Sequence, residues 1–283
     1  MNLFSLAQNL LPQQKLSELA GNLARSQNPY IKKSLISAFA KAYDISLDEY
    51  QRENLTDYDS FNDFFTRELK PGQRPIDSTP NSIICPADGT ISQIGTIHHD
   101  AILQAKGFNY SAGQLLADFE LGKTFIDGQF ATIYLAPSNY HRVHMPFDGK
   151  LIQSRYIPGS LFSVNKNTAE NIPDLFARNE RLVCIFETDF GLASVVLVGA
   201  MIVAGIECVA TGRLHRTPYI QEQKHELLLK KGDELGRFYL GSTAIVLLPK
   251  SAHNQWHPSI VADKKVVMGE KIGQLKMHKT IFD

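Results

Sequence analysis

Apolar residues recur at helical spacing through the first sixty residues of the chain. Leu3, Leu6, Leu10 and Leu11 share one face of a predicted helix, and Pro12 ends it. Two further apolar stripes predict two more helices. These stripes are Leu16, Leu19 and Leu23, and then, after Pro29, Ile31, Leu35, Ile36 and Phe39.

The pattern changes after a polar linker that contains Pro71 and Pro75. From Ile83 onward, short apolar runs alternate with Gly, Pro, Asn and Asp turns, which is typical of β-structure. We therefore predict an α+β fold. An N-terminal helical segment, residues 1–70, precedes a β-rich body, residues 71–283.

The longest apolar run, residues 192–206, is too short for a membrane span, which takes about 20 apolar residues. It is interpreted as two buried strands with a break near Gly199. A helix is expected again near residues 169–176. The N-terminus lacks the basic start of a secretory signal, so any contact with a membrane is expected at its surface.

Two short motifs each occur twice in the β-rich body. Residues 86–91 (PADGTI) resemble residues 146–151 (PFDGKL), and residues 231–236 (KGDELG) resemble residues 268–273 (MGEKIG). Asp-Gly and paired glycines suit tight turns, because glycine takes positive φ without steric cost. The spacing predicts barrel-sandwich-like hairpins of the lipoyl and biotinyl type; chance recurrence of two common turns is the alternative.

Charge and cysteine content narrow the classes of function. The 29 basic and 29 acidic residues balance, so no overall field attracts nucleic acid. Cys85, Cys184 and Cys208 form no CxxC pair and are interpreted as buried free thiols in a reducing compartment. Basic residues outnumber acidic ones in the N-terminal helices, which are either an amphipathic anchor in the lipid interface or helices packed on their own domain.

Three places carry residues suited to chemistry. Asp88 lies in an Asp-Gly turn, His141 and His144 lie three residues apart, and Ser242 follows Gly241. Each also has an ordinary interpretation: a turn, a polar strand end and a Gly-Ser turn. Metal ligation by the histidines is the weakest interpretation, because no matching Cys or acidic pair lies nearby in the sequence.

A serine hydroxyl that follows glycine can attack the preceding carbonyl when a base is near. The amide between Gly241 and Ser242 then becomes an ester, and glycine leaves that carbonyl uncrowded. Histidine suits the role of base, because its unperturbed pKa of about 6.5 lies near neutral pH. A carboxylate on the other ring nitrogen would hold the tautomer, so Asp, His and Ser form a coherent set.

Together these segments resemble the bacterial phosphatidylserine decarboxylases over nearly the whole chain. The resemblance rests on the order and spacing of many motifs, and the Leu-Gly-Ser-Thr cleavage element of that family is intact. The matching segments are residues 61–65 (FNDFF), 74–77 (RPID), 86–89 (PADG), 140–146 (YHRVHMP), 158–164 (PGSLFSV), 175–181 (LFARNER), 198–200 (VGA), 231–243 (KGDELGRFYLGST) and 268–271 (MGEK).

The resemblance implies that the chain cuts itself before Ser242. Asp88 would orient His144, and His144 would activate Ser242 to attack the preceding carbonyl. Elimination from the ester and hydrolysis would then leave two chains. These are a β chain, residues 1–241, and an α chain, residues 242–283, that begins with a pyruvoyl group made from the serine.

That covalent pyruvoyl group is the cofactor that the resemblance implies, and no metal is expected. It would form a Schiff base with the amine of phosphatidylserine and accept electrons as carbon dioxide leaves. His141 would donate the proton that completes phosphatidylethanolamine. The implied partners are phosphatidylserine, an anionic membrane surface on the cytoplasmic face of the bacterial cell membrane, and a second processed protomer in a homodimer.

Three other functions fit parts of the sequence. A pyruvoyl decarboxylase of a soluble amino acid would share Ser242, but the apolar, basic N-terminal helices favour a lipid. A serine hydrolase would share the Asp, His and Ser set, but the Gly-x-Ser-x-Gly elbow is absent around Ser242. A lipoyl-type carrier would use the turn at Asp263 and Lys264, but it would not need Asp88 and His144.

Overall fold

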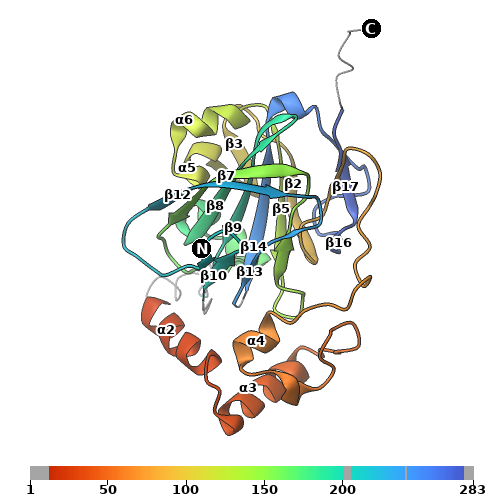
Figure 1. Cartoon of the computed structure of the whole chain (residues 1–283). Coiled ribbons are helices and arrows are strands. Elements are labelled where there is room, and N and C mark those ends of the chain that lie inside the picture. Colours follow the sequence, from red (N-terminus) through yellow and green to blue (C-terminus); the bar gives the residue numbers. More distant parts are fainter. Residues whose placement is uncertain (1–12, 201–204, 240, 277–283) are drawn as a thin grey trace.

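The computed structural model describes residues 13–200, 205–239 and 241–276. A group of helices lies at one end of a larger β-rich body (Figure 1). The predicted α+β class is confirmed, because the helical segment comes first and strands dominate the body. The first predicted helix, residues 3–11, lies outside the described residues.

Side chains cap the helices of the N-terminal segment. Asn28 accepts hydrogen bonds from the backbone N–H groups of Tyr30 and Ile31, and a proline fills the first helical position. Ser60 caps a later helix by accepting from the N–H of Asp63. The helices are α2 (Gln13–Ala24), α3 (Pro29–Ala42), the 3₁₀ helix η1 (Leu55–Asp57) and α4 (Phe61–Phe65).

An aromatic cluster packs these helices together. The Phe39 ring of α3 contacts the rings of Phe61, Phe64 and Phe65 in α4, with centroids 5.1 to 6.3 Å apart. Tyr140 of the β-rich body is buried in the same cluster. The helical segment therefore packs directly against the part of the body that carries the two candidate histidines.

The body is built on an eight-stranded antiparallel sheet. Its neighbouring strands are, in order, β12 (Gln221–Leu229), β7 (Gly149–Ile157), β8 (Arg181–Thr188), β9 (Gly191–Val198), β14 (Ser242–Leu248), β5 (Gln129–Leu135), β2 (Gly89–Thr96) and β16 (Lys265–Val266). β14 lies between β9 and β5, and Ser242 at its first position pairs with Leu135 of β5. The candidate cleavage site thus stands at the beginning of an interior strand.

β14 is buried on both faces of this sheet. Ala244 and Val246 belong to one hydrophobic cluster, whereas Ile245 and Leu247 belong to another on the opposite side. All seven residues of the strand are buried. Burial on both faces explains why the sequence after Ser242 is an unbroken apolar run rather than an alternating one.

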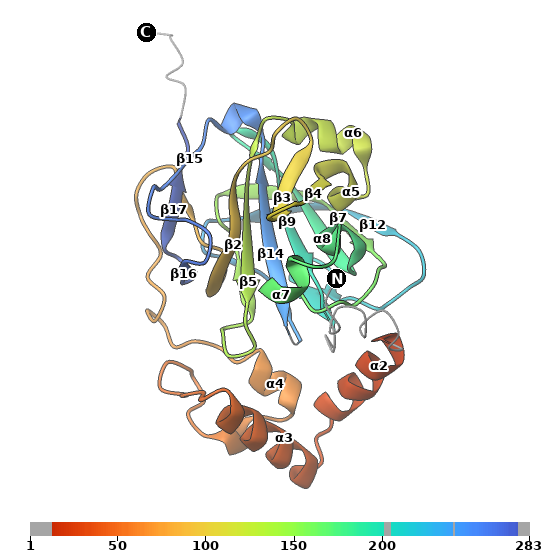
Figure 2. The same ribbon diagram turned by 180° about the vertical axis from the view of Figure 1, so that it is seen from behind.

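Short helices cover one face of the sheet, which is turned toward the viewer in Figure 2. The helix expected near residues 169–176 is instead two short helices. Pro173 lies in the turn between them, where its missing N–H interrupts helical hydrogen bonding. The covering helices are α5 (Ala112–Leu116), α6 (Phe119–Gly122), η2 (Lys123–Phe125), α7 (Lys166–Ala169) and α8 (Leu175–Arg178).

Three smaller sheets complete the body, together with the 3₁₀ helix η3 (Lys250–Ala252). Of the two strands predicted in residues 192–206, the first is β9, whereas β10 begins only at the last residue of that run. Among the described strands, no sheet closes into a barrel. The strands, sheet by sheet, are β1 (Ser82–Ile84), β17 (Lys271–Gln274) and β15 (Gln255–Trp256); β11 (Gly212–Arg213), β10 (Ile206–Cys208), β13 (Glu234–Phe238) and β6 (Arg142–His144); and β3 (Ala101–Ala105) and β4 (Phe108–Ser111).

The four repeated motifs lie together in the body. Backbone hydrogen bonds of 2.8 to 3.1 Å join the segments around the two Asp-Gly turns to each other and to the two Gly-rich turns. These contacts place the Asp88 turn beside the strand that carries His144. These bonds, donor first, join Ile84 to Pro146, His144 to Pro86, Gly232 to Met145, and Gly269 to Cys85.

Candidate active site

Gly241 and Ser242 stand where β14 enters the core. Ser242 is fully buried. The backbone of Gly241 has a φ of +24°, in the region that favours glycine. A Cβ built on Gly241 would meet no atom within 4 Å. Backbone conformation rather than space therefore favours glycine here, and the site before the serine is uncrowded.

His141 lies beside Ser242, in the loop between β5 and β6. Its Nδ1 is 3.5 Å from the Ser242 Oγ, and its Nε2 is 3.0 Å from the carbonyl oxygen of Ala136. Because a carbonyl only accepts hydrogen bonds, Nε2 carries the proton and the lone pair on Nδ1 faces the serine hydroxyl. The contact is at the long end of hydrogen-bond distances, and its geometry is that of a base before a nucleophile.

The surroundings of His141 keep its imidazole uncharged. The ring is fully buried, and its centroid lies 4.1 Å from that of the Phe65 ring. Burial first, and then the positive charge of Arg67, lower the pKa of His141 to about 3. At neutral pH the side chain therefore presents an unprotonated Nδ1 to Ser242.

Both ring nitrogens of His144 are engaged by other groups. Nδ1 donates to the carbonyl oxygen of Gly232 at 2.8 Å, and Nε2 accepts from the hydroxyl of Tyr140 at 3.1 Å. Burial lowers the pKa of His144, although its bond to the Gly232 carbonyl opposes this. His144 is thus a neutral imidazole that faces Tyr140 in this arrangement.

The Asp88 carboxylate is held by an arginine and a backbone amide. Arg74 donates from Nη2 at 2.6 Å and from Nε at 3.0 Å, and the N–H of Met268 donates to Oδ1 at 2.8 Å. Arg74 also pairs with the more exposed Glu49 at 2.9 Å. Asp88 acts on His144 through its charge, which works against the lowering of the histidine's pKa.

The predicted site residues therefore fall into two neighbouring groups. Ser242 contacts His141, while Asp88 and His144 are joined through the backbone bond from His144 to Pro86, 2.8 Å long. Within the described part of the chain, the recorded hydrogen bonds do not join Asp88 to His144 or His144 to Ser242. The expected roles of these residues stay predictions.

Three residues of the site were not predicted from the sequence. Tyr140 and Arg74 lie inside motifs that carry the family resemblance, and Arg67 lies two residues after the FNDFF motif. The tyrosine adjoins the paired histidines, which is a usable signal. A single sequence offers no comparable signal for the arginines, because it does not tell a buried guanidinium from an exposed one.

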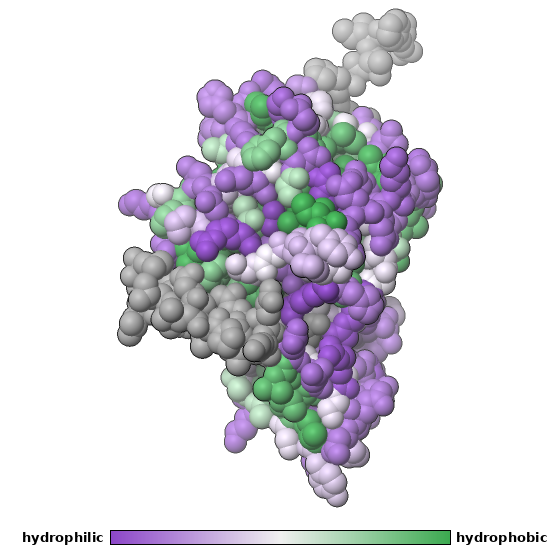
Figure 3. Space-filling view, turned by 90° about the vertical axis from the view of Figure 1, so that its left-hand side faces the viewer, coloured by the Kyte–Doolittle hydropathy of each residue, from purple (hydrophilic) through white to green (hydrophobic). Residues whose placement is uncertain are grey.

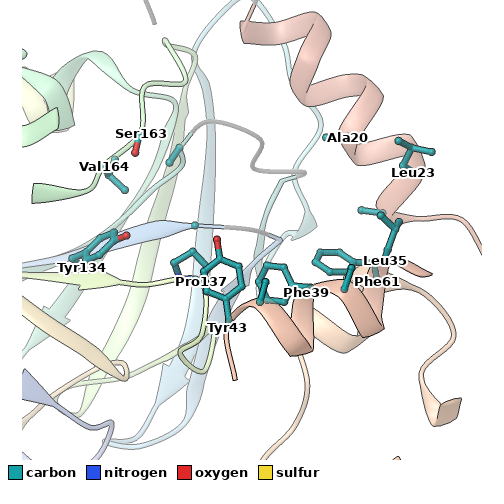
Figure 4. Close-up of a pocket in the computed structure, with 15 residues that line it drawn as sticks. Ala20, Leu23, Leu35, Phe39, Tyr43, Phe61, Tyr134, Pro137, Ser163 and Val164 are labelled. Atoms are coloured by element: carbon teal, nitrogen blue, oxygen red, sulfur yellow. The ribbon is translucent and has the colours of Figure 1, made fainter. Parts of the chain in front are cut away.

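An apolar pocket of about 610 Å³ lies between the helical segment and the body (Figure 4). One wall comes from α2, α3 and α4, and the opposite wall comes from β5 and the loop after β7. Gly241 is part of its lining, so the pocket reaches the candidate cleavage site. Residues that line it include Leu23, Leu35, Phe39, Tyr134 and Val164.

Other features of the described residues bear on metals, thiols and membranes. No group of three or more His, Cys, Asp or Glu side chains within them could hold a metal ion. The three cysteines are free and buried, as predicted. None of the helices in the described ranges has the length and apolar character needed to cross a membrane.

Comparisons with known proteins agree with the motifs. A family model described as Phosphatidylserine decarboxylase matches residues 61–274, and a second, described as PSD, matches residues 3–44. The chain is 61% identical over 277 residues to a phosphatidylserine decarboxylase proenzyme of Psychrobacter arcticus, covering 98% of this chain and 100% of the relative. A protein of the same name from Acinetobacter baumannii is 55% identical over 271 residues, covering 96% of this chain and 95% of the relative. The chain therefore belongs to the phosphatidylserine decarboxylase family.

Proposed function

We propose that this protein is a self-cleaving decarboxylase that converts phosphatidylserine to phosphatidylethanolamine and carbon dioxide. One observation carries the proposal: a fully buried serine hydroxyl, directly after a glycine, faces the lone pair of a neutral imidazole. Membership of the family, at 55 to 61% identity to proteins named as proenzymes, supports the same reaction.

We assign self-cleavage to Ser242, His144 and Asp88. Ser242 attacks the carbonyl of Gly241, which separates a β chain ending at Gly241 from an α chain beginning at residue 242. To receive the serine proton, His144 has to turn its Nε2 away from Tyr140. His141 already faces Ser242 and is the competing base.

Residue 242 also fits a covalent pyruvoyl group. The position is fully buried, so a ketone formed there is shielded from water, and the neighbouring Gly241 lines the apolar pocket. The group supplies a ketone that binds the substrate amine and withdraws electrons as carbon dioxide leaves. His141 takes a proton at Nδ1 from the headgroup ammonium and returns it to the carbon that loses carbon dioxide.

The apolar pocket supports a lipid substrate rather than a soluble amino acid. Its walls are aliphatic and aromatic, and it adjoins the residue that becomes the cofactor. Acyl chains in this pocket would bring the serine headgroup toward residue 242. A soluble amino acid has no comparable apolar part to fill such a volume.

The helical segment offers a surface for docking on an anionic membrane. A hydrophobic patch lies on this segment at the bottom of Figure 3. Exposed side chains of the segment include Leu19, Ile31 and the ring of Tyr30. Arg25 and Lys33 are exposed near them, and each cation close to an anionic surface contributes about 1 kcal/mol. We assign the protein to the cytoplasmic face of the cell membrane as a peripheral enzyme. From the family resemblance we also propose that two processed protomers form a homodimer.

The test compares two buried serines that both face a histidine. Ser242→Ala should yield one uncleaved chain without activity on phosphatidylserine vesicles, because alanine has no hydroxyl to attack the Gly241 carbonyl. Ser154→Ala is the matched control, since Ser154 Oγ lies 2.8 Å from His225 Nε2. The control should still give two chains by intact mass, the smaller one carrying the pyruvoyl group. Cleavage of the Ser242→Ala protein contradicts the mechanism.

A further inference from the structure

Arg67 is a buried cation without an anionic partner in residues 13–200, 205–239 and 241–276. Its side chain is only 1% exposed, and none of the described carboxylates forms an ion pair with it. The guanidinium lies 4.3 Å from the centroid of the Tyr50 ring, and Nε forms no hydrogen bond to the described residues. Burying an unpaired charge costs free energy. We therefore expect a function for the buried Arg67 side chain.

The guanidinium reaches from the end of α4 to the turn before His141. Its Nη2 donates to the carbonyl oxygens of Ser138 at 3.0 Å and Asn139 at 3.4 Å. The turn is closed by hydrogen bonds in both directions between Ala136 and Asn139, at 2.8 and 2.9 Å. The Ala136 carbonyl in turn accepts from His141 Nε2, which fixes the tautomer of the ring.

The helical segment thus contacts His141 in two ways. The Phe65 ring packs against the imidazole at a tilt of 34°, and Arg67, two residues later, donates to the turn that precedes it. The groups that face the ring are Phe65 and Arg67 from the helical segment, Ser242 from β14, and the backbone carbonyls of the turn. Arg67 is the charged group among them; Asp88, Glu234 and Arg142 act on His144 instead.

We propose that Arg67 is the positioning residue of His141, holding the turn at residues 136–140 so that Nδ1 faces residue 242. The proposal rests on the proposed function, because it concerns the proton that His141 moves in that reaction. The charge of Arg67 has a second effect. It opposes protonation of the ring, so the lone pair stays available.

The experiment uses the full chain with three arginine variants. Arg67→Met keeps the length of the side chain and removes both charge and donors, whereas Arg67→Lys keeps the charge and loses the planar fork. Arg52→Met is the matched control, because Arg52 also lies 4.3 Å from a tyrosine ring, that of Tyr58, and bonds Asp63 on the same helical segment. The readouts are kcat and KM on phosphatidylserine vesicles, and the NMR titration of His141 in the uncleaved Ser242→Ala background.

Arg67→Met should lower kcat by about 10²-fold, the cost of a misplacement of roughly 1 Å. KM should stay unchanged, because Arg67 is not part of the pocket lining. The titration midpoint of His141 should move to higher pH in Arg67→Met and stay near the wild-type value in Arg67→Lys. Arg52→Met should match the wild type in every readout.

Wild-type kcat in Arg67→Met overturns the proposal, as does a rise in KM alone. An unchanged His141 titration in that variant also overturns it. If Arg67→Met does not fold, Arg67→Lys carries the test: we expect a lower kcat at unchanged KM, and wild-type kcat overturns the proposal. An uncleaved or inactive wild-type protein would instead contradict the proposed function, which keeps the two failures distinct.

Discussion

At the scale of residues, distance to a histidine does not distinguish the candidate nucleophile. Ser154 lies closer to a histidine nitrogen than Ser242 does, at 2.8 Å against 3.5 Å. Ser154 follows Gln153 in the interior of β7, whereas Ser242 follows Gly241 at the start of β14. The difference lies in the backbone before the serine, where glycine permits the distortion that acyl transfer requires.

Replacement of each histidine is predicted to block a different step: self-cleavage for His144 and decarboxylation for His141. His144→Ala should leave an uncleaved chain, because the proposed base for Ser242 is gone. The His141→Ala protein should still cleave itself at least in part. It should then decarboxylate the substrate about 10²–10⁴-fold more slowly, because general acid–base catalysis typically contributes that factor to the rate. Gel analysis measures cleavage, and carbon dioxide release per cleaved chain measures turnover.

The reverse pattern, with His141→Ala uncleaved and His144→Ala mature, would exchange the two roles. The 3.5 Å contact between His141 and Ser242 makes this the specific alternative to check. Tyr140→Phe is a useful third variant, since it frees Nε2 of His144 without touching either histidine. Faster cleavage of that variant would support the role of His144.

The buried histidines also predict how stability depends on pH. Burial lowers the folded-state pKa of both, that of His141 to about 3, whereas an unfolded histidine titrates near about 6.5. Below that pH the unfolded state binds more protons, so stability falls as pH falls through 6.5 toward the folded pKa. The slope should reach about 1.4 kcal/mol per pH unit for His141, and the lowered pKa of His144 adds to the slope in the same direction.

Urea unfolding of the uncleaved Ser242→Ala chain measures this slope. His141→Gln in that background should remove the contribution of one histidine and flatten the profile between about pH 7 and pH 5. A stability that does not change over this window would show that neither imidazole is kept neutral by the fold.

At the scale of elements, Arg74 ties the linker after the helical segment to the turn between β1 and β2. Its pair with Asp88 is largely buried, whereas its bond to Glu49 is half exposed and worth little. Arg74→Met or Asp88→Asn alone should cost about 3–5 kcal/mol, because each leaves a buried group without its partner. The double variant should cost clearly less than the sum, by urea unfolding in the Ser242→Ala background. Additive losses would mean that the two groups do not depend on each other.

Local signals in the sequence predicted most of the elements. The apolar stripes at helical spacing predicted α2 and α3, and the short apolar runs from Ile83 onward predicted the β-rich body. The prediction of a single helix near residues 169–176 was wrong, because Pro173 lies between two short helices there.

The candidate site was less predictable than the strands around it. His141 and His144 are three residues apart, yet His141 lies in the loop before β6 and His144 lies in β6 itself. The contacts that orient them come from Arg67, Tyr140 and Gly232. Periodicity describes neighbours along one element, so it contains no information about such distant contacts.

At the scale of the whole molecule, the helical segment is predicted to bind anionic vesicles. Among the described residues of this segment, Leu19 and Tyr30 are the most exposed large hydrophobic residues, at 61% and 84%, and neither lines the apolar pocket. Leu19→Gln with Tyr30→Gln should weaken sedimentation with anionic vesicles about tenfold or more, because a loss of about 1.4 kcal/mol is a factor of ten.

Deleting residues 1–12 should also weaken binding while self-cleavage persists. High salt should weaken binding only in part, since apolar contacts are not screened.

The control for docking replaces apolar residues exposed elsewhere. Phe119 and Leu228 are 68% and 77% exposed on the body. Changing both to Gln should leave vesicle binding unchanged. Tight binding by the Leu19 and Tyr30 double variant would place the docking surface on the body instead.

The interior position of β14 has a consequence for the life of the protein after it is cut. The strand would belong to the small chain, yet it is hydrogen-bonded along its length to β5 and β9 of the large one. After cleavage, the two chains would therefore stay associated as one molecule. Once unfolded, however, they have to find each other as separate molecules, while the uncut chain refolds alone. Cleavage before Ser242 would thus make refolding depend on protein concentration, whereas refolding of the uncut chain does not require two molecules to meet.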